Sequence, residues 1–275
     1  MSSDESRQGN TREGWLAGRS RGTEDSLAVS IEAARELYHR KGGGHDFDHV
    51  LRVLALAIRI AEAEGADLHV VGTAALLHDI GEADGRKDHH LRGASMAREL
   101  LSGEPPEFVD AVAHAIEAHR FRAEPGPRTP EAQIVSDADK LDAIGAIGIA
   151  RVFAYAGARG TALWRAPWRE IATTARPTPQ DPAPQTLQDA IIQPKSLGAD
   201  YTPVHEYVYK LSQIPEYLYT STACRMASER LAFMRTFFDR LDEEMADGVF
   251  LPRGRLGSSA CGILSFHLLL SFWKA

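Results

Sequence analysis

Apolar residues recur at steps of three and four along most of the chain, which is the spacing of one face of an α-helix. The clearest stripe comprises Val50, Val53, Leu54, Ala57 and Ile60. Few segments alternate apolar and polar residues with a period of two, as a half-buried strand would. The pattern therefore predicts an all-α fold.

The same spacing sets the approximate bounds of the predicted helices. These are residues 26–41, 46–63, 68–81, 91–101, 106–119, 132–155, 204–211 and 221–245. Glycines at 42–44 are expected to end the first helix, and Asp46 is a candidate N-cap for the second. Pro105 and Pro106 suit the start of the fifth helix, because the donor that proline lacks has no partner in a first turn.

Three segments fall outside the helical pattern. Residues 1–24 are polar and are expected to form a disordered lead-in. Residues 175–200 hold five of the 14 prolines, which block helix formation and predict an extended surface insertion. Residues 247–275 form an irregular tail whose apolar run is too short to span a bilayer. We expect the helices between residues 25 and 246 to form a single domain.

Charge and cysteine content narrow the choice of partner and compartment. The 275 residues include 31 basic and 38 acidic side chains, a formal charge of −7. This balance argues against non-specific binding to a nucleic acid polymer, which needs a broad basic surface. Only two cysteines occur, so a disulfide framework is not indicated and a cytoplasmic location is expected. Membrane association is not predicted, and a homodimer stays an open alternative.

Three polar segments interrupt the apolar helices. His45 and His49 are four residues apart and share a helical face, and His78 and Asp79 end an otherwise apolar helix. Residues 136–142 contain three aspartates at the head of another apolar segment. A buried carboxylate beside an imidazole needs a positive partner, and a divalent cation is one solution. Each segment alone also fits a helix cap or a surface histidine.

Taken in order, these segments resemble the HD superfamily of metal-dependent phosphohydrolases. Residues 45–53 read His-Asp-x-x-His-x-x-Arg-Val and residues 76–80 read Leu-Leu-His-Asp-Ile. Residues 137–151 read Asp-Ala-Asp-x-Leu-Asp-Ala-Ile-Gly-Ala-Ile-Gly-Ile-Ala-Arg, which is the most specific match. The resemblance covers about residues 26–157, and it resumes weakly at 205–211 and 220–241. It implies a helical bundle of the HD-domain type.

The resemblance also implies one divalent-metal site, whose ligands would be His49, His78, Asp79 and Asp139. Two imidazoles and two carboxylates suit a borderline cation. We favour Mn²⁺, with Fe²⁺, Co²⁺, Ni²⁺ or Mg²⁺ as alternatives. Asp139 matches the family's Ala-Asp-x-Leu, and Asp137, two residues away on a different helical face, is the alternative ligand. Whether a second metal binds stays open.

Other residues would act on the substrate. Asp79 and Glu82 are candidates for moving protons, although Glu82 could equally be a solvated loop residue. Arg52 and Lys140 could hold phosphate oxygens or form salt bridges to Asp48 or Asp142. His119 is the better candidate of the pair His114 and His119 for contacting phosphate or a second metal. Weaker candidates around the mouth of the site are His45, Lys87, His89 and His90.

These roles predict a phosphohydrolase that uses metal-activated water on a small phosphoester, with nucleotides first among the substrates. One similar branch cleaves nucleoside triphosphates to monophosphate and pyrophosphate. The alternatives are an HD-fold di-iron oxygenase and a non-catalytic nucleotide-sensing domain. A cyclic-dinucleotide phosphodiesterase fits less well, because no Gly-Tyr-Pro follows His78-Asp79. The sequence departs from the family at Leu231, where Glu-Arg-His is usual, so specificity could differ.

Overall fold

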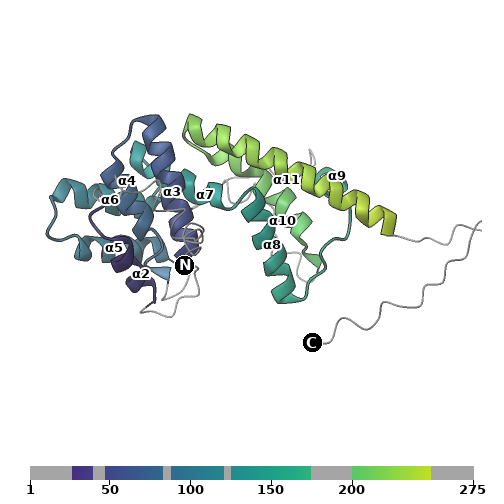
Figure 1. Ribbon diagram of the computed structural model, residues 1–275, viewed down its shortest axis with the longest axis horizontal. Helices are drawn as coiled ribbons and strands as arrows, with labels where there is room; N and C mark the ends of the chain where they lie inside the picture. The colour runs from purple at the N-terminus through teal and green to yellow at the C-terminus, as the bar shows by residue number, and fades with distance from the viewer. Residues whose placement is uncertain (1–26, 40–46, 83–87, 121–124, 175–199, 249–275) are drawn as a thin grey trace, which may run out of the picture.

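The computed structural model describes residues 27–39, 47–82, 88–120, 125–174 and 200–248 (Figure 1). Among these residues every regular element is a helix, which confirms the all-α prediction. In chain order the elements are α2 (Ile31–His39), α3 (Phe47–Glu64), α4 (Leu68–Leu77), α5 (His89–Leu100), α6 (Pro106–Ala118), α7 (Pro130–Asp142), α8 (Ala146–Arg159), α9 (Trp168–Thr174), α10 (Pro203–Tyr209), the 3₁₀ helix η4 (Leu211–Tyr217) and α11 (Ser221–Gly248).

Helices α3 to α7 form the first group, with α4 at its centre. Helix α4 packs against α3, α6 and α7, and every residue from Val70 to Leu77 is buried. A helix that is apolar all round needs neighbours on every side, which explains its central place. Its start is fixed by Asp67, whose side chain accepts hydrogen bonds from the backbone N–H groups of His69 and Val70. This core helix therefore carries His78 and Asp79 on a rigid support.

Proline marks the start of two further helices in this group. Pro106 begins α6, as predicted, and Pro130 begins α7 after Thr129, which caps the backbone N–H of Ala132. Helix α7 packs against α3, α4 and α6. Its last turns thus bring Asp139 and Asp142 next to His49 of α3.

The prediction of one helix over residues 132–155 is wrong. Helix α7 ends at Asp142 and α8 begins at Ala146. Between them Gly145 has a φ of +82° and a ψ of −155°, a conformation essentially restricted to glycine. This turn ends α7 just after its aspartates and sends α8 into the second group of helices.

The second group comprises α8 to α11 and has an aromatic core. The Tyr207 and Phe238 rings stack with centroids 4.3 Å apart, and Phe153 and Trp168 pack against this pair. Helix α9, which contains Trp168, was not predicted. The predicted segment 204–211 is α10, and η4 continues the chain after it.

Helix α11 joins the two groups, and Figure 1 shows it as the long helix that starts beside the first group and extends over the second. It contacts α3 and α7 as well as α8, α9 and η4. Glu64 at the end of α3 accepts hydrogen bonds from the backbone N–H of Thr222 and the hydroxyl of Ser221. The single domain over residues 25–246 stays a prediction.

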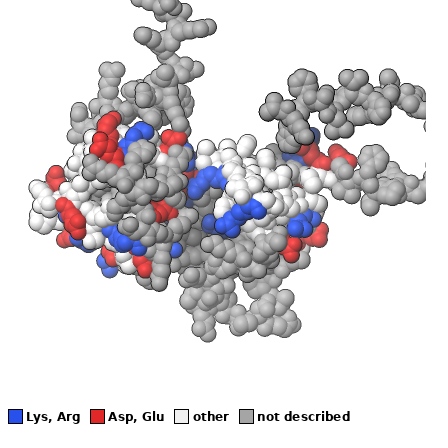
Figure 2. Space-filling view, turned by 90° about the horizontal axis from the view of Figure 1, so that it is seen from below, with Lys and Arg blue, Asp and Glu red and all other residues white. Residues whose placement is uncertain are grey.

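Several predictions fall on residues outside the described ranges. They concern the lead-in 1–24, the insertion over 175–199, the tail from 249, His45, Asp46 and Lys87. Within the described ranges, no helix taken singly has the length and apolar character to cross a membrane, and only the pair α7 and α8, bent by 59°, passes that test together. On the face drawn in Figure 2, the coloured side chains of both charge signs are interspersed.

Candidate metal centre

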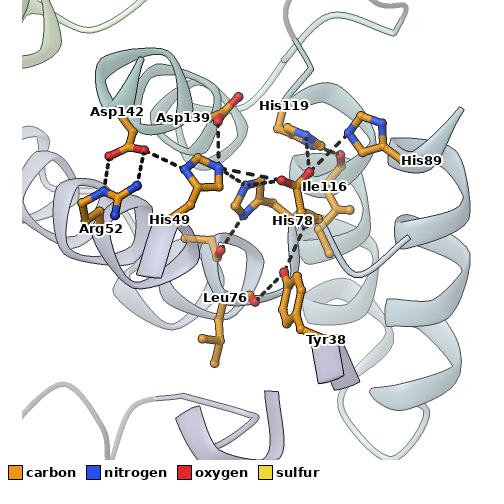
Figure 3. A network of polar contacts seen from close by, with 12 residues as sticks. Tyr38, His49, Arg52, Leu76, His78, His89, Ile116, His119, Asp139 and Asp142 are labelled. Carbon is orange, nitrogen blue, oxygen red and sulfur yellow. Dashed lines mark hydrogen bonds and ion pairs between the residues drawn. The ribbon is translucent and has the colours of Figure 1, made fainter. Parts of the chain in front are cut away.

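Three helices bring the predicted ligands together. His49 lies in the first turn of α3, His78 and Asp79 follow the end of α4, and Asp139 lies on α7 (Figure 3). His49 Nε2 is 3.4 Å from both His78 Nε2 and Asp139 Oδ1. Asp79 Oδ2 is 3.3 Å from His78 Nε2 and 3.8 Å from His49 Nε2. His49, His78 and Asp79 thus bring two imidazole nitrogens and a carboxylate close enough together to hold one metal ion. Asp139 lies beside His49 and would add a second carboxylate, and such a donor set suits a divalent cation.

Backbone carbonyls fix two of the imidazoles in this region. His78 Nδ1 donates to the carbonyl oxygen of Ala75 at 2.8 Å, and His119 Nδ1 donates to that of Ile116 at 2.6 Å. A carbonyl oxygen only accepts, so Nδ1 carries the proton in both rings. The Nε2 atom of each neutral ring therefore keeps the lone pair that a metal needs.

Burial and charge act against each other at these residues. Burial raises the pKa of Asp79, but the charge of His78 and hydrogen bonds with His119, His78 and His89 outweigh it and hold that pKa well below its usual range. Burial lowers the pKa of His49, whereas its bonds with Asp139 and Asp142 raise it to about 9. A bound cation would compete with the proton that this raised pKa favours on His49.

Asp137 and Asp139 have separate surroundings. Asp137 is fully buried and accepts hydrogen bonds at the start of α11, from Tyr219 N at 3.0 Å and from Thr220 N and Oγ1 at 2.8 Å each. Its oxygens are thus engaged in joining α7 to α11. Asp139 instead lies beside His49, and the geometry favours it over Asp137 as the ligand.

A second group of side chains gathers on the other oxygen of Asp79. His89 Nε2 lies 3.3 Å and His119 Nε2 lies 3.5 Å from Asp79 Oδ1, and the three residues could also hold a metal ion. His89 was among the weaker candidates from the sequence, because no helical spacing relates it to Asp79, ten residues earlier. His114 lies apart, where its Nε2 accepts from the backbone N–H of Arg128.

Arg52 and Lys140 have different surroundings. Arg52 pairs with Asp142 through Nε at 2.7 Å and Nη2 at 3.0 Å, at the edge of the cluster. The ammonium group of Lys140 donates to Ser136 Oγ at 2.5 Å and lies over the Tyr219 ring. These contacts direct Lys140 toward α11 rather than toward the predicted ligands.

Tyr38 and Leu231 complete the surroundings. The Tyr38 hydroxyl donates to the carbonyl of Leu76 at 3.1 Å and accepts from the backbone N–H of Asp79 at 3.3 Å, so it supports the turn that carries Asp79. The sequence did not single out Tyr38, because a tyrosine on an amphipathic helix is expected to be part of the hydrophobic core. Leu231, where the family resemblance would lead one to expect a histidine, packs against the hydrophobic core.

Comparison with known proteins agrees with this fold. Residues 46–144 match the HD domain family. YpgQ of Bacillus subtilis is 32% identical over 210 residues, which cover 74% of this chain and 86% of YpgQ. The chain therefore belongs to the HD-domain family.

Solved structures and partial relatives extend the comparison. The crystal structure of YpgQ in complex with ADP has a TM-score of 0.56 and 30% identity, and covers 78% of this chain and 94% of that one. An HD-superfamily hydrolase from Bacillus thuringiensis has a TM-score of 0.56 and 25% identity, over 82% and 97% of the two chains. Ribonuclease Y of Chloroflexus aurantiacus is 37% identical over 107 residues, but only 19% of its length is matched.

Proposed function

We propose that this protein is a divalent-metal-dependent phosphohydrolase that acts on a small phosphoester, with a nucleotide as the preferred substrate. The observation that carries the proposal is the convergence of His49, His78 and Asp79, with Asp139 beside His49. A divalent cation held there would polarise a phosphoryl group and lower the pKa of water. The ADP bound to YpgQ supports a nucleotide, because that relative shares most of its length with this chain.

The surrounding residues would bind the substrate and move protons. Arg52, whose side chain is 32% exposed beside the cluster, would hold phosphate oxygens at the rim. His119 would contact the phosphate from the Asp79 side. Glu82, partly buried in the turn after Asp79, would accept or supply a proton together with Asp79. The role of Lys140 in holding phosphate oxygens and the cytoplasmic location of the protein stay predictions.

The test is a Mn²⁺-supplemented screen of nucleotides and phosphoesters with the products identified by ³¹P NMR. Release of phosphate from a nucleoside monophosphate indicates cleavage of a phosphomonoester bond. Release of pyrophosphate from a nucleoside triphosphate indicates cleavage of the anhydride bond next to the α-phosphate. Asp79→Ala should lose bound metal and hydrolysis together, because a ligand to the metal is removed. Asp110→Ala, which removes an exposed aspartate on α6, is the matched control and should retain both. Hydrolysis retained by Asp79→Ala would contradict the proposal.

One observation keeps a second candidate function open. His89 and His119 meet at the second oxygen of Asp79, which is the arrangement that a di-iron oxygenase would need for another metal. Metal analysis separates the two candidates. Two irons per chain, with no phosphate or pyrophosphate released from any substrate, would favour the oxygenase.

A further inference from the structure

Asp142, the last residue of α7, is a buried carboxylate that contacts side chains from two other helices (Figure 3). It is 1% exposed. Its Oδ2 lies 2.7 Å from His49 Nδ1 and 3.0 Å from Arg52 Nη2, and its Oδ1 lies 2.7 Å from Arg52 Nε. Arg151 on α8 reaches Oδ2 at 3.3 Å. One acidic group thus joins a predicted metal ligand to two arginines.

The contact with His49 decides which imidazole nitrogen faces the cluster. A carboxylate only accepts, so Nδ1 of His49 must donate to it. The Nε2 atom on the opposite side of the ring then points at Asp139 and His78, as a metal ligand must. His78 and His119 owe the same orientation to backbone carbonyls. His49 differs from them because a side chain, which can be substituted, fixes its ring.

The arginine contacts place the same carboxylate between the interior and the rim. The side chains of Arg52 and Arg151 are 32% and 47% exposed, whereas that of Asp142 is buried. Arg52 grips both oxygens in a bidentate pair, which fixes the direction of its guanidinium plane. Asp142 therefore holds an imidazole on its inner side and guanidinium groups on its outer side.

We propose that Asp142 is a positioning residue, which fixes the metal-binding orientation and tautomer of His49 and at the same time directs Arg52 along the rim of the site. Carboxylates that accept from the second nitrogen of a metal-binding histidine affect metal affinity without touching the metal. The inference rests on the metal centre of the proposed function. It adds a residue to which the sequence motif gave only the role of an ion-pair partner.

Asp142→Asn tests this with little change in size. The amide has one oxygen where the carboxylate has two, so it cannot accept from both His49 and Arg52 Nε. If its NH₂ group faces His49, the ring is forced into the tautomer whose Nε2 carries a proton and cannot bind metal. We expect the Kd for Mn²⁺, measured by titration calorimetry, to rise about 10- to 100-fold. Asp137→Asn is the matched control: it alters another buried aspartate of α7 and should lower thermal stability with the Kd unchanged.

A second measurement observes the proton on His49 directly. In wild-type protein loaded with diamagnetic Zn²⁺, the Nδ1 proton of His49 should give a slowly exchanging downfield NMR signal, which Asp142→Asn shifts or removes and Asp137→Asn leaves in place. An unchanged Kd in Asp142→Asn, or no such signal in the Zn²⁺-loaded wild type, would overturn the inference. Neither readout depends on turnover. A wild type that binds Mn²⁺ but hydrolyses no phosphoester would therefore overturn the proposed function alone.

Discussion

A substitution of Glu82 would test the proposed proton transfer separately from metal binding. It lies in the turn after α4, where its backbone N–H donates to the carbonyl of Asp79 at 3.0 Å. Burial, the charge of Asp79 and the charge of Glu82 together raise the pKa of Tyr38 well above its usual value, so Glu82 shares the electrostatic surroundings of Asp79. We expect Glu82→Gln to keep its metal and to slow turnover about 10²-fold, as loss of a general acid or base does.

Metal content by atomic emission and kcat at saturating substrate check this prediction together. Loss of metal along with rate would show that Glu82 supports the ligands. A rate equal to that of wild type would return Glu82 to the role of a loop carboxylate.

At the residue scale, the sequence was enough to predict site residues that are neighbours in the chain or that follow one another in a specific order. His78 and Asp79 are neighbours at the end of an apolar helix, and their order relative to His49 and Asp139 is specific. Asp142 is different, because its contacts with His49 and Arg52 span 93 and 90 residues of chain. No periodicity encodes such a distance, so the positioning residues could be recognised only in three dimensions.

Glycine at position 81 decides how closely the turn after α4 approaches α5. A Cβ added there would lie 2.2 Å from the carbonyl oxygen of His89 and 2.6 Å from the backbone nitrogen of Gly93. Backbone atoms cannot rotate away, so α5 would have to move. We expect Gly81→Ala to lower the free energy of unfolding by about 1–3 kcal/mol, measured by urea denaturation.

Gly157 on α8 is the matched control, since an added Cβ meets no atom within 4 Å. Gly157→Ala should raise the free energy of unfolding by about 0.5–1 kcal/mol, because alanine is the better helix former. Equal effects of the two substitutions would contradict the close approach of the turn to α5.

Glu64 links the end of α3 to the start of α11 in a pH-dependent way. Hydrogen bonds from Thr222 and Ser221 lower the pKa of this carboxyl below its ordinary value of 4.5. A carboxyl with a lowered folded-state pKa stabilises the fold above its unfolded pKa, and this contribution is lost as the pH falls through the folded value. Glu64→Gln should therefore lower Tm clearly at pH 7 and much less at about pH 3.

Thermal unfolding followed by circular dichroism measures this difference. Gly157→Ala changes no titrating group, so its effect on Tm should be alike at the two pH values. A Glu64→Gln effect that is the same at both would show that the hydrogen bonds to α11 do not stabilise the charged carboxylate.

At the element scale, helical periodicity located most helices but not their breaks. Residues 132–155 are apolar enough to read as one helix, and only the positive φ of Gly145 separates α7 from α8. Glycine also occurs inside helices, as Gly148 does in α8. The sequence therefore marks glycines at which a break could occur, but it does not say which of them makes one.

Metal binding should stabilise the whole fold, because the predicted ligands come from α3, the end of α4 and α7. A cation that binds the folded state stabilises it by about 2.7 kcal/mol when its free concentration is 100 times Kd. For a chain of this size the corresponding rise in Tm is about 5–10 °C. We expect Mn²⁺ to produce this rise in chelator-treated wild type and no rise in Asp79→Ala. Calorimetry measures both.

A substitution of Phe238 would separate stabilisation by the bound metal from the stability of the fold without metal. Its side chain is fully buried and stacks on Tyr207 in the second group of helices, so Phe238→Ala should cost about 3–5 kcal/mol. Since α11 joins the two groups, we expect the variant to unfold at a lower temperature with and without Mn²⁺, while the rise that Mn²⁺ produces is retained. A rise that persists in Asp79→Ala would place the stabilising metal elsewhere. A rise lost in Phe238→Ala would show instead that the ligand geometry depends on the packing of the second group.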